Sequence, residues 1–337
     1  MIPHNLPTLG AEEEEAAGRV LSSGWVAQGP EVAAFENELC QFFGIPNGHA
    51  LAVSSGSAAL YLALVAVDGA GKRIGLPVYA CAALRNAIGL VGGNCVYLDS
   101  EAGSPNLDMA AANRAGIDIL IAPSMYGIPV DLSGARSFKI IEDIAQSLGA
   151  EESGIRIGLR GELGICSFYA TKLMTSGGQG GAVISHDKKL IERLRDYRQF
   201  DCRDDEKLRF NFQMTDLQAA IGRVQLEKLP LFIRQREEIF GIYRSAGFDL
   251  LDTPSRTNQP VRYRAVMRCP EPAKVIQALA ASGVRAIVPV EKQELLDPNG
   301  LYAVATELTQ TTASLACYPS LIKKDAMRIV QIIKNLI

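Results

Sequence analysis

The sequence predicts an α/β protein with a mostly parallel sheet and a second, smaller domain. Along the first two thirds of the chain, short apolar runs alternate with helical patterns, and a buried parallel sheet requires this alternation. The chain has 337 residues, whereas a single hydrophobic core stops growing near roughly 250 to 300 residues. We therefore expect a large domain over residues 1–235 and a smaller one over 236–337.

The first predicted helix covers residues 30–43, where apolar residues recur at helical spacing behind a Gly-Pro start. Two further helical patterns follow, at 57–67 and 82–92. Short apolar runs around these helices are the predicted strands of the sheet: residues 49–53, 73–78, 94–99, 117–123, 137–143, 163–170 and 180–185.

The C-terminal third carries a different pattern. A long helix is predicted to begin near Thr215, and Pro230 predicts a break or a kink in it because proline lacks the amide hydrogen. Beyond this helix we expect shorter strands, such as residues 262–269, and a final helix over 323–337.

Composition argues against several classes of protein. The net charge of -3 gives no basic surface for nucleic acid, so no nucleic-acid partner is expected. The seven cysteines include no Cys-x-x-Cys pair, which favours reduced thiols, and no metal site is predicted. The N-terminus lacks the pattern of a signal peptide, and no apolar run reaches the length of a membrane span. We expect a soluble, cytoplasmic protein without a membrane partner.

Three polar sites follow predicted strands, where open α/β sheets bind their ligands. The first is the small, hydroxyl-rich turn in "VSSGSAAL", residues 53–60. Gly56 and Ser57 would present amide hydrogens and a hydroxyl at a helix N-terminus, an arrangement that suits a phosphate. No Gly-Lys-Ser/Thr follows, which excludes a Walker-type loop. The alternative is a plain helix N-cap.

The second site lies in "KIIEDIAQSLGA", residues 139–150, where Asp143 ends an apolar strand and Gln146 follows three residues later. Burial of such a carboxylate is costly unless a cation faces it. The protonated nitrogen of a pyridine ring would serve. The alternative is an ordinary loop carboxylate that caps the next helix.

The third site is Lys172, at the mouth of a half-apolar strand predicted over residues 167–171. A lysine in a desolvated pocket becomes a nucleophilic amine that can form Schiff bases with carbonyl groups. Ser167 could supply a further hydroxyl for a phosphate. The alternative is a solvated surface lysine. Taken together, a phosphate cradle, a ring-nitrogen partner and an aldehyde partner meet the needs of pyridoxal 5'-phosphate.

The chain also resembles the DegT/DnrJ/EryC1/StrS aminotransferases, pyridoxal phosphate enzymes of fold type I that mostly aminate keto sugars. The resemblance extends over nearly the whole chain and depends on motifs in matching order. These motifs are "GWVAQGPEVAAFE" (24–36), "SSGSAAL" (54–60), "APSMYGIPVDL" (122–132), "IEDIAQSLGA" (141–150), "SFYATKLMTSGGQGG" (167–181), "NFQMTDLQAAIGRVQLEKL" (211–229) and "CYPSL" (317–321).

The resemblance implies a large domain with a mostly parallel seven-stranded sheet and a smaller α+β C-terminal domain. It also implies that Lys172 holds the cofactor as an internal aldimine and moves protons. Asp143 would pair with the ring nitrogen and Gln146 with the phenolic oxygen. The phosphate would be held by Gly56, Ser57 and Ser167.

Further implications concern the partner subunit and the ring face. Asn211 matches an asparagine that reaches the phosphate of the neighbouring subunit, which implies a homodimer with shared active sites. Cys81 stands where many members carry an aromatic residue over the ring, and either Tyr79 or Cys81 would cover that face.

The implied reaction moves an amino group from glutamate or glutamine to a keto sugar, expected to be nucleotide-linked. A sugar dehydratase of the same family is one alternative, although dehydratases of that type replace the lysine with histidine. A non-catalytic regulator that binds pyridoxal phosphate is another. It is disfavoured because the sequence carries no DNA-binding segment.

Overall fold

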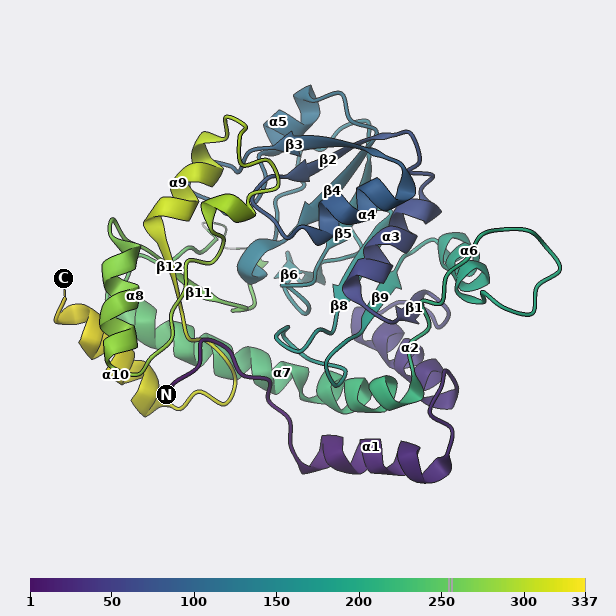
Figure 1. Ribbon diagram of the computed structural model, residues 1–337, viewed down its shortest axis with the longest axis horizontal. Coiled ribbons are helices and arrows are strands. Elements are labelled where there is room, and N and C mark those ends of the chain that lie inside the picture. Colours follow the sequence, from purple (N-terminus) through teal and green to yellow (C-terminus); the bar gives the residue numbers. More distant parts are fainter. Residues whose placement is uncertain (254, 256, 337) are drawn as a thin grey trace.

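A seven-stranded sheet forms the centre of the computed structural model, which describes residues 1–253, 255 and 257–336 (Figure 1). Its strand order is β1-β9-β8-β5-β4-β2-β3, and β9 alone runs antiparallel to its neighbours. The strands are β1 (Ala50–Val53), β2 (Arg73–Pro77), β3 (Asn94–Leu98), β4 (Ile119–Pro123), β5 (Lys139–Asp143), β8 (Leu163–Ser167) and β9 (Gly181–Ile184). The predicted mostly parallel sheet is confirmed.

Helices cover both faces of this sheet, which explains why its strands are apolar without alternation. In β1, β4, β8 and β9 every residue is buried. The helices of the larger part of the molecule are α1 (Ala11–Ser23), α2 (Pro30–Phe43), α3 (Gly56–Ala66), α4 (Ala83–Val91), α5 (Met109–Arg114), α6 (Lys188–Arg198) and α7 (Asp216–Ser245). A 3-10 turn over Met125–Gly127 follows β4.

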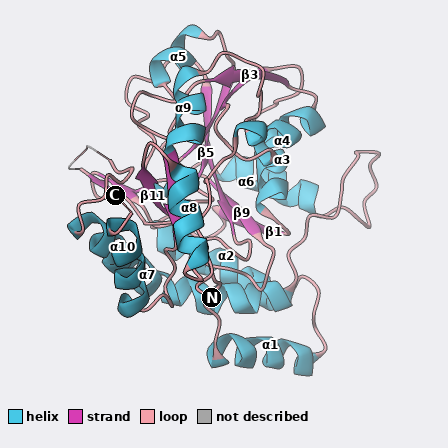
Figure 2. Cartoon of the chain, turned by 60° about the vertical axis from the view of Figure 1, so that its left-hand side comes forward, coloured by secondary structure: helices cyan, strands magenta, loops and turns pink. Residues whose placement is uncertain are grey.

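The C-terminal part has a second hydrophobic cluster around a small antiparallel sheet (Figure 2). Its elements are β11 (Ala265–Arg268), β12 (Thr312–Leu315), α8 (Pro272–Ala281), α9 (Ala303–Thr311), α10 (Lys323–Lys334) and a 3-10 turn over Lys292–Glu294. The N-terminal Ile2 joins this cluster. The predicted final helix is therefore present up to Lys334, and Ile337 at its predicted end lies outside the described residues.

Helix α7 runs through both clusters. It begins near Thr215, as predicted, behind a capping box that Thr215 forms with Gln218, and it continues through Pro230 without interruption. The predicted break at Pro230 is wrong, because the surrounding turns are held by packing against α1 and α2. Since α7 crosses residue 235, the division into 1–235 and 236–337 stays a prediction.

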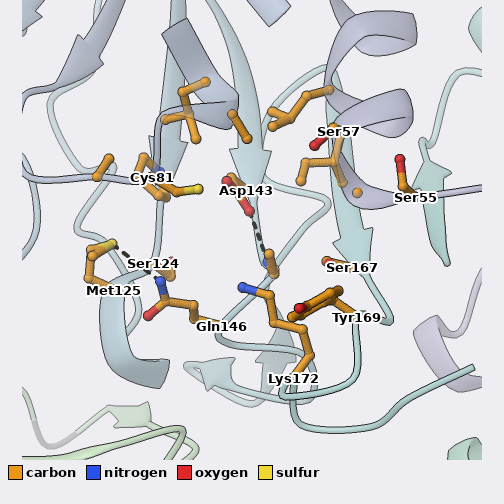
Figure 3. Close-up of a pocket in the computed structure, with 18 of the residues that line it drawn as sticks. Ser55, Ser57, Cys81, Ser124, Met125, Asp143, Gln146, Ser167, Tyr169 and Lys172 are labelled. Atoms are coloured by element: carbon orange, nitrogen blue, oxygen red, sulfur yellow. Dashed lines mark hydrogen bonds between the residues drawn. The ribbon is translucent and has the colours of Figure 1, made fainter. Parts of the chain in front are cut away.

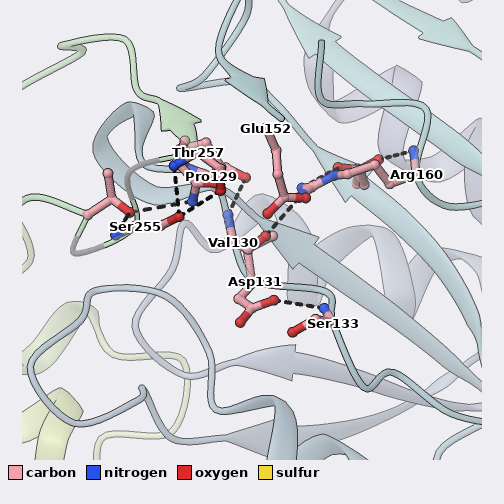
Figure 4. Close-up of polar contacts among 12 residues, drawn as sticks. Pro129, Val130, Asp131, Ser133, Glu152, Arg160, Ser255 and Thr257 are labelled. Atoms are coloured by element: carbon pink, nitrogen blue, oxygen red, sulfur yellow. Dashed lines mark hydrogen bonds and ion pairs between the residues drawn. The ribbon is translucent and has the colours of Figure 1, made fainter. Parts of the chain in front are cut away.

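A three-stranded ribbon links the two parts. It comprises β6 (Glu151–Glu152), β7 (Ile155–Arg156) and β10 (Asn258–Gln259). Beside it, Arg160 forms ion pairs with Glu142 at 2.6 Å and Glu152 at 2.7 Å and donates to the carbonyl of Val130 (Figure 4). The cation is satisfied by these partners, so we assign it a structural role.

Two strand predictions need correction. The strand predicted over 163–170 ends at Ser167, because the chain then folds back on itself: the Phe168 amide donates to the Gly180 carbonyl, and the Ala170 amide to Gly178. The strand predicted over 262–269 begins only at Ala265. Lys172 consequently lies on a loop, not at the mouth of a strand.

Candidate active site

A cavity of about 320 Å³ opens at the carboxyl ends of the parallel strands (Figure 3). This volume is in the range of small-molecule sites. The predicted residues that line it are Gly56, Ser57, Cys81, Asp143, Gln146, Ser167 and Lys172. The structure thus brings together seven residues that are separated by up to 116 positions in the sequence.

The N-terminus of α3 and the end of β8 form one wall. The Ser55 hydroxyl caps α3 by accepting the Ala58 amide at 3.1 Å, so the plain N-cap is Ser55. Gly56 and Ser57 begin the helix, where amide groups lack partners within the helix. A Cβ added at Gly56 would lie 2.7 Å from the Cβ of Ser167. A side chain at residue 56 would therefore displace Ser167, and we call the Gly56–Ser167 contact, together with the amides that begin α3, the cradle.

We expect Gly56→Ala to weaken the affinity for pyridoxal phosphate by about tenfold or more, because the displaced Ser167 hydroxyl no longer reaches the phosphate. The backbone of Gly56 is helical, so alanine itself imposes no backbone strain. Equilibrium dialysis of the two proteins measures the change. Gly89→Ala in α4 is the matched control, since a Cβ there meets nothing within 4 Å. If both variants lost the same affinity for pyridoxal phosphate, Gly56 would have no specific role in phosphate binding.

Asp143 is the buried carboxylate of the site. It ends β5, is only 7% exposed, and accepts the Ala145 amide at 2.9 Å. Burial raises the pKa of this carboxyl, while the Ala145 amide and the charge of Lys172 partly offset the effect. Among the described residues Asp143 has no ion-pair partner within 4.0 Å. A cationic group bound in the cavity would therefore stabilise its ionised form.

Lys172 is half-buried on the loop after β8, and its amine points into the cavity (Figure 3). The loop is fixed locally, since the Lys172 amide donates to the Tyr169 carbonyl at 2.9 Å. It is also held from the N-terminus, where the Asn5 amide group donates to the Thr171 carbonyl at 2.9 Å. These bonds fix the backbone from which the Lys172 side chain extends.

Gln146 is held by the turn that follows β4. Its Oε1 accepts the Tyr126 amide at 2.9 Å, and its Nε2 lies 3.8 Å from the Met125 sulfur. Tyr126 has a φ of 58°, an uncommon left-handed conformation for a bulky residue. The backbone contact fixes the amide orientation and leaves Nε2 available for a stronger acceptor.

Tyr79 and Cys81, the two residues predicted for the ring face, differ in exposure. Tyr79 is fully buried and accepts a hydrogen bond from the Tyr126 hydroxyl at 2.7 Å, so it does not line the cavity. Burial raises the pKa of Tyr79 to about 12. Cys81 is exposed and lines the cavity.

Asn211 does not join the other predicted residues. It is exposed on the loop before α7, where its Oδ1 accepts the Gln213 amide at 3.0 Å. It is absent from the lining of the cavity. Within one subunit, Asn211 is therefore not part of the site.

Sequence reasoning missed three residues of the site region. Ser55 could have been found, because it stands in the same hydroxyl-rich turn as Gly56. Tyr126 orients Gln146 through its backbone, and Tyr263 places its ring 5.4 Å from the Lys172 amine. Tyr126 stands in the motif at residues 122–132, but the motif does not indicate its contact with Gln146, and no motif includes Tyr263.

Comparison with known proteins identifies the family. The sequence profile of the DegT/DnrJ/EryC1/StrS aminotransferase family matches residues 7–334. The chain belongs to this family. The resemblance stated from the motifs, and with it the fold type I architecture, is confirmed.

Two curated relatives show the range of described roles in the family. EryC1 of Saccharopolyspora erythraea, described as an erythromycin biosynthesis sensory transduction protein, is 30% identical over 97% of this chain and 95% of its own length. GDP-perosamine synthase of Escherichia coli O157:H7 is 30% identical over 72% of this chain and 70% of its own.

Solved structures agree with this fold. S. venezuelae DesV, crystallised with a ketimine intermediate, superposes with a TM-score of 0.89 at 27% identity, covering 96% of this chain and 94% of its own. The aminotransferase TlmJ from Streptoalloteichus hindustanus has a TM-score of 0.93 at 24% identity, covering 99% and 98%. At that identity TlmJ supports the fold alone.

The residues present fit pyridoxal phosphate. The cradle at Gly56 admits an anion, Asp143 is a buried carboxylate without an ion-pair partner among the described residues, and the Lys172 amine faces the same cavity. Over the described part of the chain, no group of three or more acidic, histidine or cysteine side chains could hold a metal ion. No helix of those residues has the length and apolarity to cross a membrane.

Proposed function

We propose that this aminotransferase uses pyridoxal 5'-phosphate to move an amino group from glutamate or glutamine to a keto sugar carried on a nucleotide. One observation carries the proposal: in a chain of this family, Lys172, Asp143 and the cradle at Gly56 meet in one cavity. Relatives described as a dTDP-amino-sugar transaminase and a GDP-perosamine synthase support the nucleotide-linked sugar.

Bound in this cavity, the cofactor supplies an aldehyde and an electron-accepting ring. With the cofactor bound, the Lys172 amine would hold the aldehyde and, when free, would move a proton at the substrate carbon. Asp143 holds a proton on the ring nitrogen, which favours electron acceptance. Both roles require that Lys172 and Asp143 lie close to the same bound cofactor, and both residues line this cavity.

The remaining residues orient the cofactor. Gln146 donates from Nε2 to the phenolic oxygen, since its Oε1 is already occupied by the Tyr126 amide. Ser57, Ser167 and the amides at the start of α3 hold the phosphate. Cys81 would cover one face of the ring, because its exposed side chain lines the cavity whereas that of Tyr79 is buried.

The function is tested by following each half of the reaction separately. Purified protein loaded with cofactor should lose its visible absorbance when glutamate or glutamine is added, and regain it when a nucleotide-linked keto sugar follows. An amino sugar should appear in equal amount. If neither glutamate nor glutamine removed the visible absorbance, or if no amino sugar formed, the proposal would be contradicted.

Two alternatives are distinguished by the same assay. A dehydratase would release water and leave no amino group on the sugar, and Lys172 stands where dehydratases of this family carry histidine. A non-catalytic regulator, a role compatible with the description of EryC1, would bind the cofactor without turnover. Stoichiometric amino-sugar formation excludes both.

We further propose that the active enzyme is a cytoplasmic homodimer in which Asn211 completes the partner's phosphate site. Asn211 is exposed and outside its own cavity, which supports a role across an interface. Mixing Lys172→Ala subunits with Asn211→Ala subunits should then restore one intact site in each mixed dimer. With equal mixing, half of the dimers are mixed, so about a quarter of the parent activity is expected.

The control for this mixing experiment is each variant alone, taken through the same exchange procedure. Mass spectrometry of the intact dimers confirms that subunits have exchanged. If exchange is complete and activity stays at the sum of the two variants, Asn211 does not act across the interface.

A further inference from the structure

Two cations lie close to the ring of Tyr263. The Lys172 amine is 5.4 Å from the ring centroid, and the Arg264 guanidinium carbon is 5.6 Å from it. Both distances are within the reach of a cation–π contact, in which the negative face of the ring attracts positive charge. Tyr263 is only 5% exposed, so water screens the contact with Lys172 weakly.

The backbone around Tyr263 is held by several elements. The Tyr263 carbonyl accepts from Arg236 of α7 at 3.1 Å, and Arg236 is itself buried. The preceding Val261 amide donates to the Gly127 carbonyl at 3.0 Å, on the turn that orients Gln146. Gly127 has a φ of 89°, and a Cβ there would lie 1.6 Å from the Val261 oxygen, so only glycine permits this approach.

We propose that Tyr263 is a positioning residue that holds the free amine of Lys172 at the cofactor site. The inference rests on the proposed function, in which the lysine amine is released from the cofactor in every turnover and must then act at the reacting carbon. An unrestrained lysine side chain has four rotatable bonds, whereas the ring face selects the conformations that keep its ammonium group in the cavity, where loss of one proton to solvent gives the neutral amine that attacks the aldehyde.

The electrostatics of the phenol agree with this contact. Burial is the largest influence on the pKa of Tyr263 and raises it, but the charges of Lys172, Arg264 and Arg236, together with a hydrogen bond to Thr171, outweigh burial and lower that pKa.

The test measures how fast cofactor-free protein attaches pyridoxal phosphate, followed by the visible absorbance that marks the covalent bond. Tyr263→Leu should slow attachment by about tenfold or more, whereas Tyr263→Phe, which keeps the ring face, should stay within about twofold of the parent. Affinity for pyridoxamine phosphate, which forms no bond to Lys172, should be unchanged in both variants. A purely structural role would lower both quantities together and would overturn the proposal.

A shape-matched pair keeps the test decisive if Tyr263→Leu fails to fold. Phenylalanine and pentafluorophenylalanine at position 263 have nearly the same size, but fluorination removes the negative ring face. The fluorinated protein should attach the cofactor about tenfold more slowly than the phenylalanine variant. Equal rates would show that ring shape alone matters. A parent protein that gains no visible absorbance with pyridoxal phosphate would contradict the proposed function. Equal attachment rates in the phenylalanine and pentafluorophenylalanine variants would contradict only the role of Tyr263.

Discussion

Lys172→Ala should form no covalent bond to pyridoxal phosphate and should lose at least about a thousandfold of the transamination rate. The amine is both the nucleophile for the aldehyde and the group that moves the proton, and proton transfer alone contributes about 10² to 10⁴ in rate. Non-covalent binding should persist, because the cradle at Gly56 and Ser167 is unchanged. Absorbance spectra and initial rates measure the two losses.

The matched control is Lys188→Ala, which removes an exposed lysine of α6 that forms an ion pair with Glu192 at 3.4 Å. This variant should behave like the parent protein in both measurements. If Lys172→Ala retained covalent cofactor or normal turnover, another amine would be the reactive group. The alternative of a solvated surface lysine would then describe Lys172.

Asp143→Asn should lower the rate of the chemical step by about a hundredfold while cofactor loading stays nearly normal. Asparagine keeps the shape and can still accept the Ala145 amide, but it removes the charge that holds a proton on the ring nitrogen. Preorganised electrostatic contacts of this kind are worth on the order of 3 kcal/mol. Single-turnover rates with an amino donor, compared with cofactor affinity, separate the two effects.

Asp108→Asn is the control for the local backbone contact. Asp108 caps α5 by accepting the Ala110 amide at 2.7 Å, two residues ahead, as Asp143 accepts Ala145. This variant should leave turnover unchanged. An Asp143→Asn protein that turned over like the parent would show that Asp143 is only a capping residue.

The same substitution has a defined effect on the cofactor-free protein. Because burial raises the folded-state pKa of Asp143, its neutral form stabilises the fold at low pH, and that contribution is lost as the pH rises through the raised value. At neutral pH, asparagine should therefore leave the thermal midpoint unchanged or raise it. The difference from the parent should shrink below the usual pKa range of aspartate.

Much of the fold followed from local patterns. The helix over residues 30–43 was predicted with its bounds, since proline and glycine mark both of its ends. The strand over 163–170 was predicted too long, because "SFYA" is as apolar as the strand before it. Only the contacts with residues 178 and 180 turn the chain there. Pro230 likewise lies inside the continuous helix α7, although local helix propensity alone predicts that a proline interrupts the helix.

The site was predictable where the chemistry is local. Gly56, Asp143 and Lys172 each follow a strand and carry a distinctive residue type, so their convergence followed from the topology of a parallel sheet. Tyr263 lies 91 positions from Lys172 in a segment that resembles an ordinary strand. Its contact with Lys172 arises only when the C-terminal part packs against the sheet.

Borohydride reduction shows which residue carries the cofactor, and we expect that residue to be Lys172. Reduction of the loaded protein fixes the cofactor permanently on the amine that holds it, and peptide mapping then locates that amine. We expect the label on the peptide that contains Lys172, in about one equivalent per subunit of the parent and in none of the Lys172→Ala protein. A label on any other lysine, or no label on a protein that transaminates, would contradict the account.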